Sequence, residues 1–269
     1  MEKIIQTIAG EFNIKPVQVE NTVKLIDEGN TIPFIARYRK EVTGNLSDEI
    51  LRDLNDRLTY LRNLEKRKEE VIKSIEEQGK LTDELFIAIG TSKTLAEVED
   101  LYRPYKQKKR TRAIIAKEKG LEPLAKIIME QEEIKPILEI AKEYINKEKK
   151  VETAEDAIQG AKDIIAEDIS DNAKFRKYIK GACYREALIE TKASKEEEKS
   201  NYEMYYDFSE EIKKIPSHRI LAINRGEKEE FLKVTVEKPY ERIYGFLRKN
   251  TIKGDTQFTE ILEETIEDS

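Results

Sequence analysis

Residues 29–44 read Gly-Asn-Thr-Ile-Pro-Phe-Ile-Ala-Arg-Tyr-Arg-Lys-Glu-Val-Thr-Gly, and they lie between two strong helical patterns. Gly29 suits the left-handed position that ends a helix. Ser47, followed by two acidic residues, suits the N-cap of the next helix. We therefore expect residues 29–44 to form a structured joint between helices and not a flexible linker.

Two kinds of side chain are concentrated in this joint. The aromatic residues are Phe34 and Tyr38, and the basic residues are Arg37, Arg39 and Lys40. Together they could bind nucleic acid by stacking on bases and neutralising phosphates. Alternatively, the basic residues pair with nearby carboxylates and tie helices together. For the joint, the sequence favours this second interpretation.

Helical patterns dominate on both sides of the joint. Residues 2–12 and 16–28 predict a pair of helices before it, and residues 47–78 predict one long helix after it. The composition agrees, with 39% charged residues, few glycines and prolines, and no tryptophan. We expect a mostly α fold, a multi-helical array with one long helix.

The long helix shows a packed seam in its first half. The seam leucines are Leu51, Leu54, Leu58 and Leu61. The next two positions with this spacing are Glu65 and Lys68, so fewer than three uninterrupted heptads are present. The pattern favours packing within the chain over a dimeric coiled coil, and it predicts an exposed middle for this helix.

A charged stretch at residues 192–200 is the expected domain boundary. It would separate a helical domain of residues 1–191 from a second domain of residues 201–269. In the second domain, residues 219–224 and 231–237 are β-rich and predict an antiparallel hairpin near 219–237. The last helical pattern reaches Ser269 without a stop signal, so we expect the chain to be truncated there.

The most basic segment comprises residues 103–112. Its six basic residues are Arg103, Lys106, Lys108, Lys109, Arg110 and Arg112. Pro104 and the charge density predict an exposed, irregular segment, where Tyr102 and Tyr105 could stack on bases. A solvated loop that tethers two helices explains this segment equally well. Compared with the joint, the 103–112 segment is the stronger candidate for a phosphate contact.

Several classes of function are disfavoured by the composition. The net charge of −6 means that any nucleic-acid binding must come from local clusters. With His218 as the single histidine and no phosphate-binding glycine loop, we expect no enzyme, no metal site and no cofactor. A single cysteine, Cys183, and the lack of a signal peptide or membrane-length apolar run predict a soluble cytoplasmic protein.

Five motifs follow one another along the chain. They lie at residues 31–41, 77–82, 99–112, 119–124 and 214–228, and the most specific is Pro-Phe-Ile-Ala-Arg-Tyr-Arg-Lys-Glu at 33–41. In kind and order they resemble the Tex family of bacterial transcription accessory proteins. The resemblance extends from about residue 3 to about residue 237 and weakens after Lys238.

The resemblance carries expectations about architecture. Tex proteins are longer than this chain, and they bind nucleic acid mainly through a C-terminal oligonucleotide-binding barrel. That barrel follows a ribonuclease-H-like domain and helix-hairpin-helix motifs. The resemblance therefore implies an N-terminal fragment that ends before the ribonuclease-H-like domain and contains a helix-turn-helix-like element near its start.

Two functions are compatible with these expectations. In the first, the chain is a helical scaffold that positions downstream nucleic-acid-binding domains and adds secondary basic contacts to RNA or DNA. In the second, it is a protein–protein interaction module for the transcription machinery, such as RNA polymerase, without direct nucleic-acid contact. Arginine and tyrosine favour both kinds of interface. Neither function involves a membrane.

Overall fold

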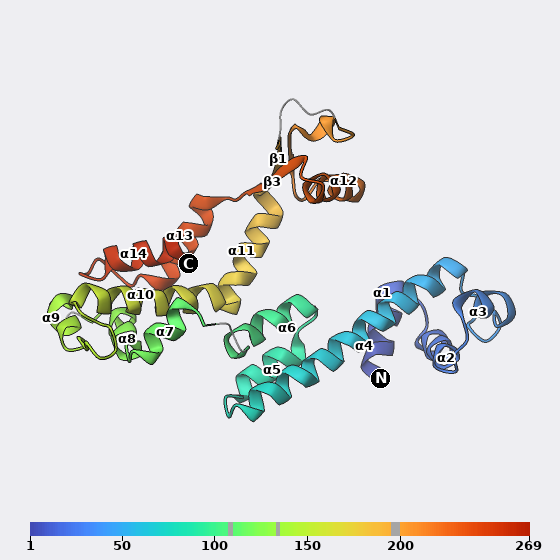
Figure 1. Cartoon of the computed structure of the whole chain (residues 1–269). Helices are drawn as coiled ribbons and strands as arrows, with labels where there is room; N and C mark the ends of the chain where they lie inside the picture. The colour runs from blue at the N-terminus through green and yellow to red at the C-terminus, as the bar shows by residue number, and fades with distance from the viewer. Residues whose placement is uncertain (107–109, 133–134, 195–199) are drawn as a thin grey trace. The chain divides into compact units, whose positions relative to one another are not determined.

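The computed structural model describes residues 1–106, 110–132, 135–194 and 200–269 (Figure 1). In these ranges the chain forms fourteen α-helices and three strands, which confirms the mostly α prediction. Contacts divide the chain into two compact units, Met1–Tyr102 and Arg103–Ser269. Among the described residues, no helix is long and apolar enough to cross a membrane.

Unit 1 is built around one long helix. Its elements are α1 (Glu2–Phe12), α2 (Pro16–Asp27), α3 (Ile32–Tyr38), α4 (Asp48–Glu77), α5 (Asp83–Thr91) and α6 (Leu95–Tyr102). Helix α4 begins as predicted, because the Ser47 hydroxyl accepts a hydrogen bond from the Ile50 N–H at 3.2 Å. Helices α1 to α3 gather along the first part of α4, and α5 and α6 along the second (Figure 1).

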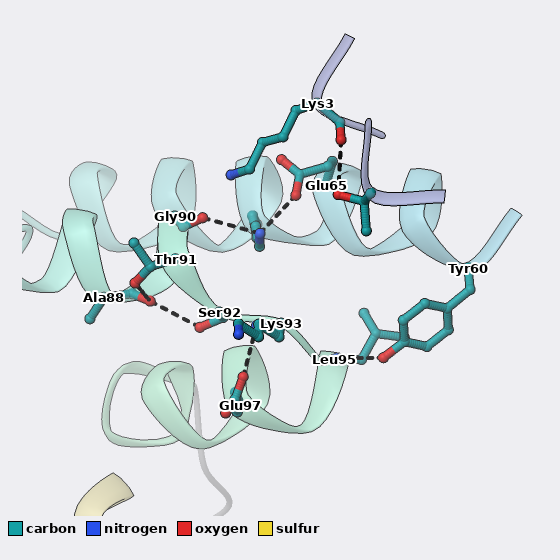
Figure 2. Close-up of polar contacts among 12 residues, drawn as sticks. Lys3, Tyr60, Glu65, Ala88, Gly90, Thr91, Ser92, Lys93, Leu95 and Glu97 are labelled. Carbon is teal, nitrogen blue, oxygen red and sulfur yellow. Dashed lines mark hydrogen bonds and ion pairs between the residues drawn. The ribbon is translucent and has the colours of Figure 1, made fainter. Parts of the chain in front are cut away.

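The middle of α4 is covered, contrary to the prediction. The four seam leucines are buried as expected, and Leu64 and Lys68 are buried as well. The Lys68 ammonium donates to Glu65 Oε1 at 2.7 Å and to the Gly90 carbonyl at 3.2 Å (Figure 2). Because its ammonium is hydrogen-bonded and its stem is apolar, Lys68 can continue the packed face towards α5.

Unit 2 contains a helical core around α10. Its helices are η1 (Arg103–Tyr105), α7 (Arg112–Glu118), α8 (Glu122–Glu130), α9 (Ile137–Lys142), α10 (Ala154–Asp171), α11 (Ala173–Glu186), α13 (Tyr240–Thr251) and α14 (Thr259–Asp268). Helix α10 contacts α7, α8, α9 and α14. Its buried face includes Ala157, Gly160 and Ala161, and these small residues let neighbouring helices approach closely.

A small sheet completes unit 2. Strands β1 (Leu188–Ala193), β2 (Asp207–Glu211) and β3 (Leu232–Glu237) form an antiparallel sheet in the order β2-β1-β3. Ile189 lies opposite Glu210 on one side and Val236 on the other. Two further elements, η2 (Glu203–Tyr205) and α12 (Ser217–Lys228), pack beside the sheet and bury a small cluster that includes Ile223 and Leu232.

The prediction of a hairpin near residues 219–237 is wrong. Residues 219–224 belong to α12, and only the second half of the predicted hairpin is a strand, which pairs with β1. Pro216 stands at the N-cap, and the buried Ile223 and Gly226 are three residues apart, as one face of a helix requires. A short apolar run does not distinguish strand from helix by periodicity alone.

The division into units also differs from the expected boundary at residues 192–200. Strand β1 ends at Ala193, and its two partner strands come from the far side of that stretch. Residues 195–199 lie outside the described residues. The division between compact units falls after Tyr102 instead.

Candidate nucleic-acid interface

The joint consists of α3 and the loop that leads to α4. Pro33 lies in the first turn of α3, where its missing N–H costs nothing. Ile35 is fully buried, and α3 packs against α4. The opposite face of this short helix therefore points towards solvent.

Two amides from α2 hold the loop after α3. The Gln18 side chain donates to the Thr43 carbonyl at 3.3 Å and to the Gly44 carbonyl at 3.0 Å. Asn21 donates to the Val42 carbonyl at 2.9 Å. Gly44 adopts a φ of +65°, and a Cβ there would lie 2.6 Å from Gln18 Nε2. The segment is thus the structured joint that the sequence predicts.

Helix α2 is itself fastened to α4. Arg62 forms a two-pronged ion pair with Asp27, both contacts at 2.8 Å, and Arg57 of α4 holds Glu11 of α1 at 2.6 and 2.7 Å. Hydrogen bonds from the two arginines lower the pKa of Asp27 and of Glu11. Helix α2, which holds the joint, is therefore itself fixed to α4 by ion pairs.

The three basic residues of the joint are exposed. Among the residues that the structure describes, Arg37, Arg39 and Lys40 have no carboxylate at ion-pair distance. Arg39 Nη1 donates only a long hydrogen bond, 3.3 Å, to the Tyr38 carbonyl. The interpretation in which these residues tie helices together through ion pairs is therefore wrong.

Exposed aromatic rings lie beside these cations. Phe34 and Tyr38 are 36% and 59% exposed, and their ring centroids are 5.2 Å apart. The Arg39 guanidinium lies 5.4 Å from the Phe34 centroid, and that of Arg37 lies 6.0 Å from the Tyr38 centroid. We call these five residues, Phe34, Arg37, Tyr38, Arg39 and Lys40, the α3 surface.

The 103–112 segment has a different environment. Arg103 Nε contacts Asp171 Oδ1 at 2.7 Å, and Arg112 Nη2 contacts Asp268 Oδ2 at the same distance. Arg110 Nη2 contacts Glu118 Oε2 at 2.9 Å. All three arginines of the segment are thus engaged with carboxylates of their own unit.

The other residues of this segment add little to a binding surface. Lys106 is exposed, whereas Lys108 and Lys109 lie outside the described residues. Tyr102 precedes the segment and belongs to unit 1, where its hydroxyl is 3.0 Å from Ser74 Oγ and the Arg67 guanidinium lies over its ring. The preference for this segment over the joint is therefore not supported by the described contacts. The two clusters belong to different units.

Helix α11 is a third basic element, and it was not predicted as a candidate site. Helix α11 carries five basic residues and one acidic residue. This excess of basic residues is visible in the sequence and could have singled out the helix. Part of this charge is engaged within unit 2, because Lys174 donates to Asn250 Oδ1 and Arg176 donates to the Ser170 carbonyl. The roles of Gln18 and Asn21 had no signal in the sequence.

Comparison with known proteins identifies the family. A model of the Tex-like protein N-terminal domain matches residues 2–76, and a Tex central region-like model matches residues 132–261. The chain belongs to the Tex family. The α3 surface lies within the part that matches the Tex N-terminal domain, and the 103–112 segment lies between the two matches.

Relatives of this Tex chain include proteins from distant organisms. Uncharacterized protein YdcI of Bacillus subtilis is 50% identical over 268 residues, which are 98% of this chain and 37% of the relative. Transcriptional accessory protein Tex of Neisseria gonorrhoeae is 41% identical over 87% of this chain and 31% of its own length. S1 RNA-binding domain-containing protein 1 of Pongo abelii is 34% identical over 87% of this chain and 24% of its own length. The chain thus spans about a third or less of these relatives.

Proposed function

We propose that this chain is a helical scaffold of a Tex-type transcription accessory factor and contacts nucleic acid through the α3 surface. The family membership and the names of two relatives, a transcriptional accessory protein and an S1 RNA-binding domain-containing protein, support a role beside nucleic acid. The observation that carries the proposal is the exposure of Arg37, Arg39 and Lys40 without carboxylate partners among the described residues.

This observation matters because the chain is acidic overall. A phosphate gains most from a cation that is not already neutralised by a neighbouring carboxylate. Arg103, Arg110 and Arg112 would have to give up ion pairs before they could bind a phosphate. The cations of the α3 surface would lose no such pair, so they are the better candidates.

The scaffold part of the proposal is supported by the relatives and by the helical architecture. The relatives are roughly three times as long as this chain or longer, so further domains exist in those proteins. Each unit packs its helices around one central helix, α4 in unit 1 and α10 in unit 2, and such helical arrays could hold neighbouring domains. The proposed role is binding and positioning, without catalysis.

The test is a titration of the whole 269-residue chain with labelled 12-nucleotide RNA, DNA and duplex probes at several salt concentrations. The informative variant is Arg37→Gln/Arg39→Gln/Lys40→Gln. We expect it to weaken single-strand binding about tenfold and to reduce the slope of log K against log salt by roughly two, because each phosphate contact contributes about 0.7.

The matched control carries the same charge change elsewhere in unit 1. Lys66, Lys73 and Lys80 are exposed and lie away from α3 in sequence, so Lys66→Gln/Lys73→Gln/Lys80→Gln should bind nearly as well as the wild type. If both triple variants lost the same amount of nucleic-acid affinity, the loss would be a general effect of charge, and the assignment to the α3 surface would be contradicted.

A protein partner is the second candidate function. It is favoured by Val17 and Val42, which are exposed apolar residues on α2 and in the joint. A protein interface centred on aromatic and apolar residues should depend less on salt than a phosphate contact. No binding of any nucleic-acid probe at low salt would leave this second function as the one to pursue.

A further inference from the structure

The arrangement of rings on the α3 surface carries information beyond its charge. Phe34 and Tyr38 are four residues apart and so lie on one side of the helix, where both rings are open to water. The Arg39 guanidinium lies over Phe34 and the Arg37 guanidinium near Tyr38. Two exposed rings and two guanidinium groups thus lie close together, and Lys40 follows them in the sequence.

We infer that the α3 surface binds single-stranded nucleic acid by stacking bases on Tyr38 and on the Phe34–Arg39 pair. This inference rests on the proposed function and specifies its substrate class. Aromatic rings and guanidinium planes both accept unpaired bases, whatever the base identity. In a duplex the base faces are already stacked on one another, so only phosphates and base edges remain available.

The packing of α3 and the hydrogen bonds to the loop after it favour such a role. Ile35, on the inward side of α3, is fully buried, and the amides of Gln18 and Asn21 fix the loop that follows the helix. A surface that is already ordered loses less conformational entropy when a flexible strand binds it. Free basic loops lack this advantage.

The deciding variant is Tyr38→Ala, because Tyr38 is the more exposed ring and its truncation leaves the buried face of α3 intact. We expect its affinity for a 12-nucleotide oligo-U probe to fall about tenfold, the loss of one stacked base. The salt slope should stay unchanged, and so should the weaker affinity for a 12-base-pair duplex. Tyr38→Phe keeps the ring and should bind within about twofold of the wild type.

Tyr184 provides a matched control. It is also 59% exposed, but it lies on α11 in unit 2. Tyr184→Ala should leave oligo-U binding unchanged. Thermal unfolding of each variant shows whether it is folded.

The outcomes separate this inference from the proposed function. If Tyr38→Ala binds oligo-U like the wild type while the triple glutamine variant does not, the α3 surface contacts phosphates alone and the stacking inference is overturned. If the triple glutamine variant also binds like the wild type, the proposed function fails too. Displacement of oligo-U by an equal concentration of a glutamate-rich peptide would contradict a preference for bases and favour a protein partner.

Discussion

At the scale of single residues, the two basic clusters differ in what surrounds each guanidinium. Arg103 and Asp171 are 68 residues apart in sequence, and Arg112 and Asp268 are 156 apart. A sequence shows how many charges a segment has, but it does not show which distant carboxylate the fold brings within reach. For this reason the ion pairs that distinguish the two clusters could not be predicted from the sequence.

Gly160 illustrates a packing constraint at the same scale. A Cβ at this position would lie 2.3 Å from Leu121 Cδ1, and Leu121 is itself fully buried. We expect Gly160→Ala to destabilise unit 2 by about 1–2 kcal/mol, because overpacking outweighs the better helix propensity of alanine. Urea unfolding of the whole chain would measure this loss.

The control for that substitution is Gly10→Ala in α1. Apart from its chain neighbours and the backbone of its own helix, no atom lies within 4 Å of a Cβ built at Gly10, so alanine there should be neutral or stabilising by about 0.5–1 kcal/mol. Unchanged stability of Gly160→Ala would mean that α8 and α10 are less tightly packed than described.

At the scale of helices and strands, the residues that cap helices were more reliable signals than those that indicate strands. The predicted cap Ser47 accepts a hydrogen bond from the first turn of α4, and Thr82 and Thr153 cap α5 and α10 in the same way. The sheet was harder to foresee, because β1 pairs with strands that come much later in the chain. Residues 219–224 were misassigned because a short apolar run fits either a strand or a helix.

The ion pairs that fasten α1 and α2 to α4 should make stability depend on pH. Glu11 and Asp27 have lowered pKa values in the folded chain, so their contribution is present above the ordinary carboxyl pKa of about 4 and is lost as the pH falls through the lowered values. We expect Arg57→Gln/Arg62→Gln to be less stable than the wild type by about 1 kcal/mol at pH 7, since partly exposed pairs are weak.

This difference should shrink at pH 3, where the carboxyl groups of the wild type begin to be protonated. Thermal unfolding of both proteins at the two pH values measures it. The same difference at pH 3 as at pH 7 would show that the arginines act through packing and not through their ion pairs.

At the scale of the whole molecule, the family and the mostly α architecture were predictable, since the motifs and helical periods lie in the sequence itself. The net charge of −6 predicts that any nucleic-acid binding comes from local clusters, and this stays a prediction. The division into two units after Tyr102 was not predictable, because it depends on which segments exchange contacts. The candidate interface was recognised as a basic and aromatic segment, but its exposure became evident only once α3 was placed on α4.

The most direct measurement is photo-crosslinking of 4-thiouridine-labelled single-stranded RNA to the intact chain, followed by cleavage after glutamate and mass spectrometry. This cleavage releases residues 29–41, which contain the α3 surface, separately from residues 100–118, which contain the 103–112 segment. We predict adducts on the 29–41 peptide, centred on Phe34 and Tyr38, and their loss in Arg37→Gln/Arg39→Gln/Lys40→Gln. Adducts on the 100–118 peptide with none on 29–41 would contradict the assignment of the α3 surface as the nucleic-acid contact.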